Sequence, residues 1–187
     1  MYNALKALGF AVALVTLPVT GAFATELVSN GGFETSDFTD WTLTGNTSFT
    51  GVTTGIAHSG TYGAFFGQIG STGTISQTLN TVAGQAYSLS FWLHNDGGSP
   101  NSFDASIDGV DVLTLSDAPS FDYTQYVFAF VASGTTTPLI FTFQQDPAFW
   151  YLDDISVSDG TPAPEPMTIA LLGAGLAGFG AMRRKRT

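Results

Sequence analysis

The chemistry of this chain centres on carboxylates that have no basic partners. The segment FWYLDDISV contains the adjacent pair Asp153 and Asp154, yet no Lys or Arg occurs between residues 7 and 182. Strict strand alternation puts Asp153 on the same face as the apolar Ile155 and Val157. A buried ionised carboxylate is costly unless it is paired or hydrogen-bonded. We therefore expect backbone amides, a histidine, a retained proton or a metal ion to satisfy Asp153, or a bulge to leave it solvated.

Aromatic and polar side chains on one predicted strand suggest a binding face. In AYSLSFWLH the apolar residues occupy one face, and the other face carries Trp92 and His94. An exposed aromatic ring stacks on the apolar face of a sugar ring. As a neighbour of this pair, Gln144 would hydrogen-bond to sugar hydroxyls. The alternative is that Trp92 packs in a small cluster beneath a loop.

Groups that support catalysis are scarce. The chain has two histidines and no cysteine, and it contains neither a Gly-x-Ser-x-Gly elbow nor a His-x-x-x-His pair. Paired carboxylates serve glycosidases, but chance pairs are expected among so many Asp residues. We predict no catalytic residues and no enzymatic activity.

Charge excludes one class of partner. Residues 25–160 contain all of the fifteen Asp and Glu residues except Glu165, and they contain no Lys or Arg. Nothing here neutralises phosphates, so nucleic acid is excluded as a partner. An acidic polysaccharide would be repelled unless divalent cations bridged it. Without cysteine there are no disulfides, so stability must come from the core, helped where present by a bound ion.

Alternating segments separated by turn residues predict an all-β domain over residues 25–160. Asp108-Gly109 between two alternating runs indicates a two-residue hairpin. QYVFAFVAS is apolar on both faces, so both faces could be covered. With about nine or ten short strands and no convincing helix, the fold class is a two-sheet antiparallel β-sandwich of jelly-roll type. The other predicted strands are WTLTGNTSF, GAFFGQIG, TISQTLN, PLIFTFQQ and FWYLDDISV.

The first 24 residues have the three-part pattern of a secretory signal peptide. Lys6 precedes an apolar run, and small residues ending in Ala-Phe-Ala follow. Signal peptidase is expected to cut between Ala24 and Thr25. The alternative, an N-terminal membrane anchor, is disfavoured because the run is short and is broken near its end by Pro18 and Gly21.

The last 27 residues, 161–187, are expected to form a linker and a membrane-directed tail. A transmembrane helix is predicted at about 166–182, followed by a basic cluster at 183–186. The positive-inside bias would hold the C-terminus in the cytoplasm and leave the β domain outside. A soluble C-terminal helix is the alternative, but the segment has no polar face to turn toward water.

Three elements in order resemble the PEP-CTERM sorting signal of exported bacterial proteins: the tripeptide Pro164, Glu165 and Pro166, the apolar span, and the terminal basic cluster. The resemblance implies processing by an exosortase, an integral membrane transpeptidase. It also implies an inner-membrane precursor and a mature form at the cell surface or in extracellular matrix.

Three segments resemble jelly-roll carbohydrate-binding modules and galactose-binding-like domains: ELVSNGGFETSDFTDW, AHSGTYGAFF and FWYLDDISV. The resemblance implies a structural calcium ion, because such segments converge on one in that family. Its ligands here would be the backbone oxygens of Gly32 and Thr61, the carboxylate of Glu34, and Asp153 or Asp154. An acidic ligand common in the family near the position of His58 is missing here.

Two hypotheses about function remain. In the first, the chain is an exported, noncatalytic surface protein that binds polysaccharide through a carbohydrate-binding-module-like domain. In the second, it is a structural, calcium-binding protein of the biofilm matrix without a sugar pocket. A groove that holds two or more coplanar exposed aromatic rings would favour the first hypothesis, and a buried Trp92 without a groove would favour the second.

Overall fold

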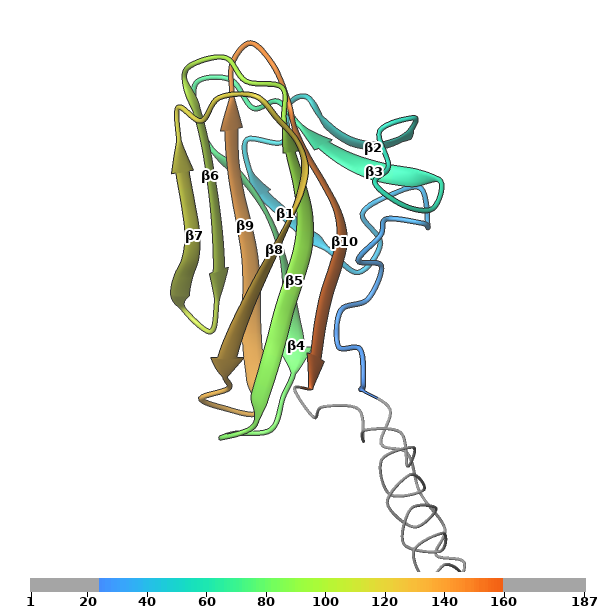
Figure 1. Ribbon diagram of the computed structural model, residues 1–187, viewed down its shortest axis with the longest axis vertical. Helices are drawn as coiled ribbons and strands as arrows, with labels where there is room; N and C mark the ends of the chain where they lie inside the picture. The colour runs from blue at the N-terminus through green and yellow to red at the C-terminus, as the bar shows by residue number, and fades with distance from the viewer. Residues whose placement is uncertain (1–23, 160–187) are drawn as a thin grey trace, which may run out of the picture. The chain divides into compact units, whose positions relative to one another are not determined.

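Ten strands and no helix make up residues 24–159, the part of the chain that the computed structural model describes (Figure 1). The strands are β1 (Thr42–Gly45), β2 (Thr50–Thr54), β3 (Tyr62–Phe66), β4 (Gly73–Asn80), β5 (Ala86–Asn95), β6 (Asn101–Ile107), β7 (Val110–Ser116), β8 (Phe121–Val131), β9 (Thr136–Gln145) and β10 (Trp150–Asp159). The predicted signal peptide, sorting tripeptide and transmembrane helix fall outside this part of the chain. Within residues 24–159, no helix is long and apolar enough to cross a membrane.

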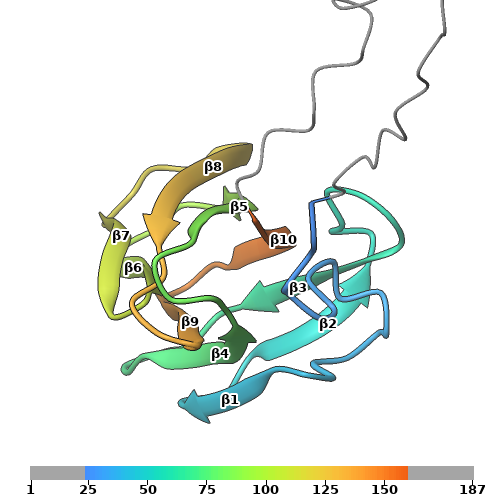
Figure 2. The same cartoon turned by 90° about the horizontal axis from the view of Figure 1, so that it is seen from below.

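The strands form two five-stranded sheets that pack face to face. One sheet has the order β1-β4-β9-β6-β7 and the other the order β2-β3-β10-β5-β8, and all neighbouring strands are antiparallel. Figure 2 shows the two layers with the strands viewed close to end-on. The predicted antiparallel β-sandwich is confirmed.

Aromatic side chains fill the space between the sheets. Phe66 on β3 and Phe143 on β9 stack across this space, with ring centroids 3.7 Å apart. Trp150 is fully buried and Trp41 almost so, and both pack in the core. Full burial of one large apolar side chain is worth about 1.5–3 kcal/mol, so this layer supplies most of the apolar stabilisation.

Two details of the strand prediction need correction. The segment predicted as one strand over residues 41–49 contains only β1 and then turns, with a positive φ of 53° at Phe49, before the unpredicted β2 begins. The outer face of β8 is not covered, because this strand lies at the edge of its sheet and leaves Val127 and Val131 about 60% exposed. The predicted hairpin at Asp108-Gly109 is confirmed, since both residues have the positive φ that such a turn requires.

The last strand, β10, ends beside the first described residues of the chain. This strand starts at Trp150 and runs to Asp159, beside the first described residues (Figure 1). There the backbone amide of Thr25 donates a hydrogen bond to a carboxylate oxygen of Asp159 at 2.8 Å. Both ends of the described chain therefore leave the domain together, and the start of β10 lies at the far end of the sandwich.

Candidate functional site

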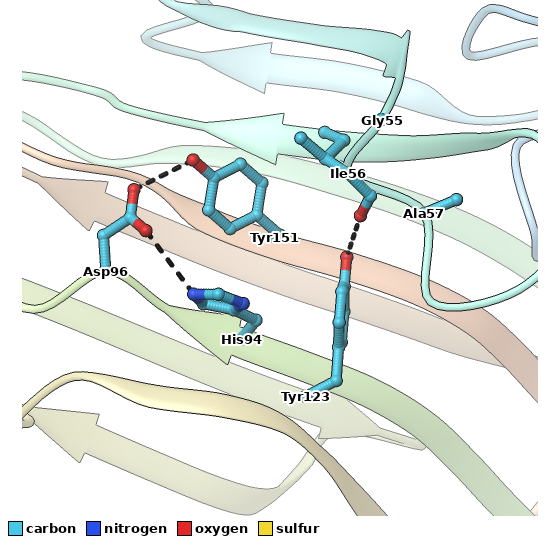
Figure 3. A pocket seen from close by; sticks show the side chains of 7 residues that line it. All are labelled: Gly55, Ile56, Ala57, His94, Asp96, Tyr123 and Tyr151. Atoms are coloured by element: carbon cyan, nitrogen blue, oxygen red, sulfur yellow. Dashed lines mark hydrogen bonds and ion pairs between the residues drawn. The ribbon is translucent and has the colours of Figure 1, made fainter.

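A hollow of about 250 Å³ opens on the outer face of the β2-β3-β10-β5-β8 sheet, near the start of β10. Register places Tyr151 of β10 directly opposite His94 of β5, and cross-strand neighbours share a face of the sheet. The hollow is lined by Gly55, Ile56, Ala57, His94, Asp96, Tyr123 and Tyr151 (Figure 3). Its residues come from three strands and from two of the connections between strands.

Two further hollows adjoin this one and share lining residues with it. The first, of about 170 Å³, shares Ile56 and Tyr151 and extends over β3. The second, of about 260 Å³, shares His94 and Asp96 and extends to the start of β8. The three hollows are thus linked by shared lining residues, and we call them together the groove. The outer two are further lined by Thr53, Phe65, Phe149, Asn95, Ser120, Phe121 and Asp122.

Aromatic rings line the groove in a continuous row. Phe65 contacts Phe149 edge-on at 5.7 Å between centroids, and Phe149 lies 6.2 Å from Tyr151. The ring of Tyr151 is 5.0 Å from that of His94, which in turn is 5.5 Å from the ring of Tyr123. The planes of neighbouring rings are inclined by 36–84°, so the expected coplanar arrangement is not present. The row therefore presents apolar edges as well as faces to a ligand.

Polar atoms in the central hollow are held by hydrogen bonds between lining residues (Figure 3). The hydroxyl of Tyr151 donates to one oxygen of Asp96 at 2.9 Å, and Nε2 of His94 lies 3.4 Å from the other oxygen. Burial, together with the bond to Asp96, raises the pKa of Tyr151 to about 12. The Tyr151 hydroxyl therefore stays protonated at neutral pH and directs its proton toward Asp96, whose second oxygen remains an acceptor.

A buried amide network fixes the connections that border the groove. Nε2 of Gln145 donates to Oδ1 of Asn95 at 2.7 Å, and Nδ2 of Asn95 donates to the carbonyl of Ala118 at 3.0 Å. The amide side chain of Asn101 bonds to the same carbonyl and to the backbone amide of Ala118. Because these side chains are buried, they hold the segments that carry Asp96 and Ser120 without ligand present.

Trp92 does not line the groove. It is half-buried beneath the connection between β2 and β3, where the imidazole of His58 stacks on it at 3.7 Å between centroids. The expected alternative for Trp92, a small cluster beneath a loop, is therefore the one observed. Tyr123 contacts the other side of this cluster, 5.3 Å from His58, and its hydroxyl donates to the carbonyl of Ile56 at 2.6 Å.

Asp153 lies under the same connection and not in the core. A register shift between Asp153 and Ser156, with φ of 48° at Asp154, forms a bulge that reverses the alternation. Asp153 therefore shares the outer face with Trp92, its partner in register, while Ile155 points inward. The prediction that Asp153 shares a face with Ile155 and Val157 is wrong, and the bulge is present but leaves Asp153 fully buried.

Backbone amides satisfy the Asp153 carboxylate. One oxygen accepts hydrogen bonds from the amides of His58 and Ser59, at 2.7 and 3.2 Å, and the other accepts one from the amide of Asp154 at 2.8 Å. Burial nevertheless raises the pKa of Asp153 to about 6. The adjacent Asp154 charge also raises this pKa, whereas the three backbone hydrogen bonds lower it. Asp154 itself bonds to Nδ1 of His58 and to the hydroxyl of Ser59, each at 2.6 Å.

The residues predicted to bind calcium lie close together. Oε1 of Glu34 accepts hydrogen bonds from the amides of Thr61 and Tyr62, at 2.8 and 3.0 Å. A Cβ atom placed on Gly32 would lie 3.7 Å from a carboxylate oxygen of both Asp153 and Asp154. Among the described residues, no group of three or more Asp, Glu or His side chains is arranged to hold a metal ion. The predicted set depends also on backbone oxygens of Gly32 and Thr61, so calcium binding stays a prediction.

The structure separates Gln144 from the groove. Gln144 is on β9, opposite Ser102 of β6, and therefore belongs to the other sheet. The expectation that it neighbours Trp92 and His94 is wrong, because alternation within a strand does not reveal which sheet the strand joins. Sequence reasoning also missed Tyr123, Tyr151 and Asp96. Alternation put Tyr151 on the same face as Asp153, which was expected to be the core face, so the sequence carried no signal for Tyr151 in the groove.

Comparisons with known proteins agree with this fold. Residues 26–158 match the family described as protein of unknown function (DUF642), and residues 162–185 match the PEP-CTERM protein-sorting motif. A search of curated protein sequences finds no match.

Several solved structures have a similar fold. TmCBM61 in complex with β-1,4-galactotriose shows a TM-score of 0.60 at 21% identity, covering 72% of this chain and 99% of that one. The CBM22-1 xylan-binding domain of Paenibacillus barcinonensis Xyn10C gives 0.53 at 15% identity, covering 75% and 97%. The K3 cleaved adhesin domain of Lys-gingipain from Porphyromonas gingivalis gives 0.52 at 14% identity, covering 74% and 100%. At these identities the likeness establishes the fold, which confirms the resemblance to jelly-roll carbohydrate-binding modules. The chain belongs to the DUF642 family and carries a PEP-CTERM protein-sorting motif at its C-terminal end.

Proposed function

We propose that the chain is an exported, noncatalytic protein that binds polysaccharide in the groove of its β-sandwich. The observation that carries this proposal is the central hollow, which the rings of Tyr151, His94 and Tyr123 line together with the carboxylate of Asp96. Aromatic rings offer apolar surface to the C–H faces of sugars, and a carboxylate oxygen, which has two lone pairs, accepts further hydrogen bonds from hydroxyl groups. The similar fold of TmCBM61, solved with a bound galactotriose, supports the proposal.

The shape of the groove suits a chain and not a single sugar. Its three hollows adjoin one another across β3, β10, β5 and the start of β8. Neighbouring strands lie about 4.8 Å apart, so an extended oligosaccharide that crosses them contacts several rings in succession. Because the buried amide network fixes the segments that carry Asp96 and Ser120, little ordering of these segments is required when the ligand binds.

Export and surface display follow from the sorting motif. The PEP-CTERM motif at residues 162–185 supports processing by an exosortase. We propose that signal peptidase first cuts between Ala24 and Thr25. We further propose that the precursor is held in the inner membrane with its C-terminus in the cytoplasm.

A structural calcium ion is a separate part of the proposal. Backbone oxygens of Gly32 and Thr61, with the carboxylates of Glu34, Asp153 and Asp154, are hard oxygen donors of the kind that Ca²⁺ takes. Such an ion would tie the segment after the N-terminus to β10 and to the connection that walls the groove. Bound only by the native state, it would stabilise the fold by mass action.

Binding of the exported protein to a glycan array, with and without calcium, tests the function. We expect binding to at least one polysaccharide class, and loss of that binding in Tyr151→Ala. If the folded protein binds no glycan, the groove proposal fails and the structural matrix hypothesis takes its place.

A further inference from the structure

The groove carries negative charge and no fixed positive charge. Asp96 lines two of its hollows and Asp122 lines one of them. No Lys or Arg occurs between residues 7 and 182, so none is available from any strand or connection of this domain.

The two histidines near the groove are already paired with carboxylates. Nδ1 of His58 lies 2.6 Å from Asp154, and Nε2 of His94 lies 3.4 Å from Asp96. A positive charge on either imidazole would therefore be offset by the protein carboxylate beside it, and would not be available to pair with a carboxylate on a ligand. A ligand carboxylate or sulfate in the central hollow would meet Asp96 as its nearest charged group, without a cationic partner.

The hydrogen-bonding groups point to the same class of ligand. The Asp96 carboxylate only accepts hydrogen bonds, and the Tyr151 hydroxyl already donates its proton to it. The Tyr123 hydroxyl likewise donates to the carbonyl of Ile56. The central hollow therefore presents mainly acceptors and ring surfaces, which match the hydroxyl donors and C–H faces of an unmodified sugar.

We infer that the groove selects uncharged glycan chains and rejects chains whose sugars carry carboxylates or sulfates. This inference rests on the proposed function, because it concerns the ligand of the same groove. Asp96 is then a specificity-determining residue: it accepts hydrogen bonds from a neutral sugar and repels an acidic one.

Matched tetrasaccharides that differ only at C6 test the inference. The pairs are β-1,4-linked glucose and glucuronic acid, β-1,4-linked mannose and mannuronic acid, and α-1,4-linked galactose and galacturonic acid. Affinities are measured by calorimetry on the exported protein in calcium and again in chelator, where no divalent cation bridges the carboxylates. In every pair that binds, we expect the acidic member to bind about tenfold or more weakly than the neutral one. Added salt should weaken this preference by screening the repulsion.

Two variants attribute the preference to the groove. Asp96→Asn should bring the affinities of the two members of a pair closer together, whereas Asp111→Asn, an exposed position on β7 of the other sheet, should leave their ratio unchanged. The charge preference would be overturned if acidic chains bound as tightly as neutral ones or more tightly. If Tyr151→Ala abolished that binding, the groove would still be the binding site. Absence of binding to all six probes and to a glycan array would overturn the proposed function itself.

Discussion

The imidazole of His58 stacks on the indole of Trp92, with ring centroids 3.7 Å apart and ring planes 15° from parallel. His58 also bonds to Asp154 through its side chain and to Asp153 through its backbone amide. The connection between β2 and β3 that carries His58 supplies Gly55, Ile56 and Ala57 to the groove. Asp153 and Asp154 therefore hold the same loop that lines the groove. Replacing either carboxylate is expected to change ligand binding as well as stability.

Replacement of His58 by Ala should uncover Trp92. The other two tryptophans, Trp41 and Trp150, are buried in the core, so a change in solvent access reports on Trp92. We expect a red shift of the fluorescence emission and stronger quenching by acrylamide. Loss of the stacked pair should cost about 0.5–1.5 kcal/mol beyond the lost burial. Unchanged quenching in the folded variant would show that His58 does not cover Trp92 in solution.

Tyr151 should supply binding energy mainly through its ring. Tyr151→Ala removes the ring from the middle of the aromatic row, and we expect at least about a tenfold loss of affinity for a glycan that binds the native protein. Tyr151→Phe keeps the ring and loses only the hydrogen bond to Asp96, so it should retain most of the affinity. Val110→Ala, at an exposed position on the other sheet, is the control and should bind as the native protein does. Equal loss in the Ala and Phe variants would contradict the stacking role.

Calcium should raise the melting temperature of the protein after chelator treatment. At free calcium a hundredfold above its dissociation constant, the gain is about 2.7 kcal/mol for an ion bound by the native state alone. Scanning calorimetry with calcium and with chelator measures it, and Asp154→Asn should reduce the difference. If the native protein, stripped of ions beforehand, melted at the same temperature with calcium and with chelator, the calcium site would be dismissed. The groove proposal would be unaffected.

Asp153→Asn should destabilise the protein even in chelator. The carboxylate accepts hydrogen bonds from three backbone amides, and an Asn side chain offers only one acceptor oxygen and places an NH₂ group among donors. A buried donor left without a partner costs about 1–3 kcal/mol. Urea denaturation measures the change, with Asp111→Asn as the exposed control. Equal stability of the two variants would mean that the amides around Asp153 are solvated.

The fold was predictable because alternation survives in most strands. In AYSLSFWLH every second residue is apolar, and β5 buries Leu89, Phe91 and Leu93 completely, as expected. The turn at Asp108-Gly109 was predictable as well, because Asp and Gly are residue types that adopt the positive φ this turn requires. The PEP-CTERM motif was predictable for a similar reason, since its parts are contiguous in the chain.

The site was less predictable because irregularities position it. The bulge after Asp153 and the register shift between Leu93 and Asn95 change which face a side chain occupies, and neither has a clear sequence signal. Gln144 was assigned to the binding face although β9 belongs to the other sheet, because sheet membership depends on pairings between distant segments. Tyr123 enters the groove only beside the second irregularity, so its role could not be read from alternation.

Chemical-shift mapping during titration with an array-identified oligosaccharide tests the central claim most directly. If the groove is the binding site, the largest perturbations fall on Tyr151, His94 and Tyr123, together with Ile56 and Ala57 on the adjoining loop. Perturbations confined to the outer face of the other sheet, around Gln144 and Ser102, would contradict the account.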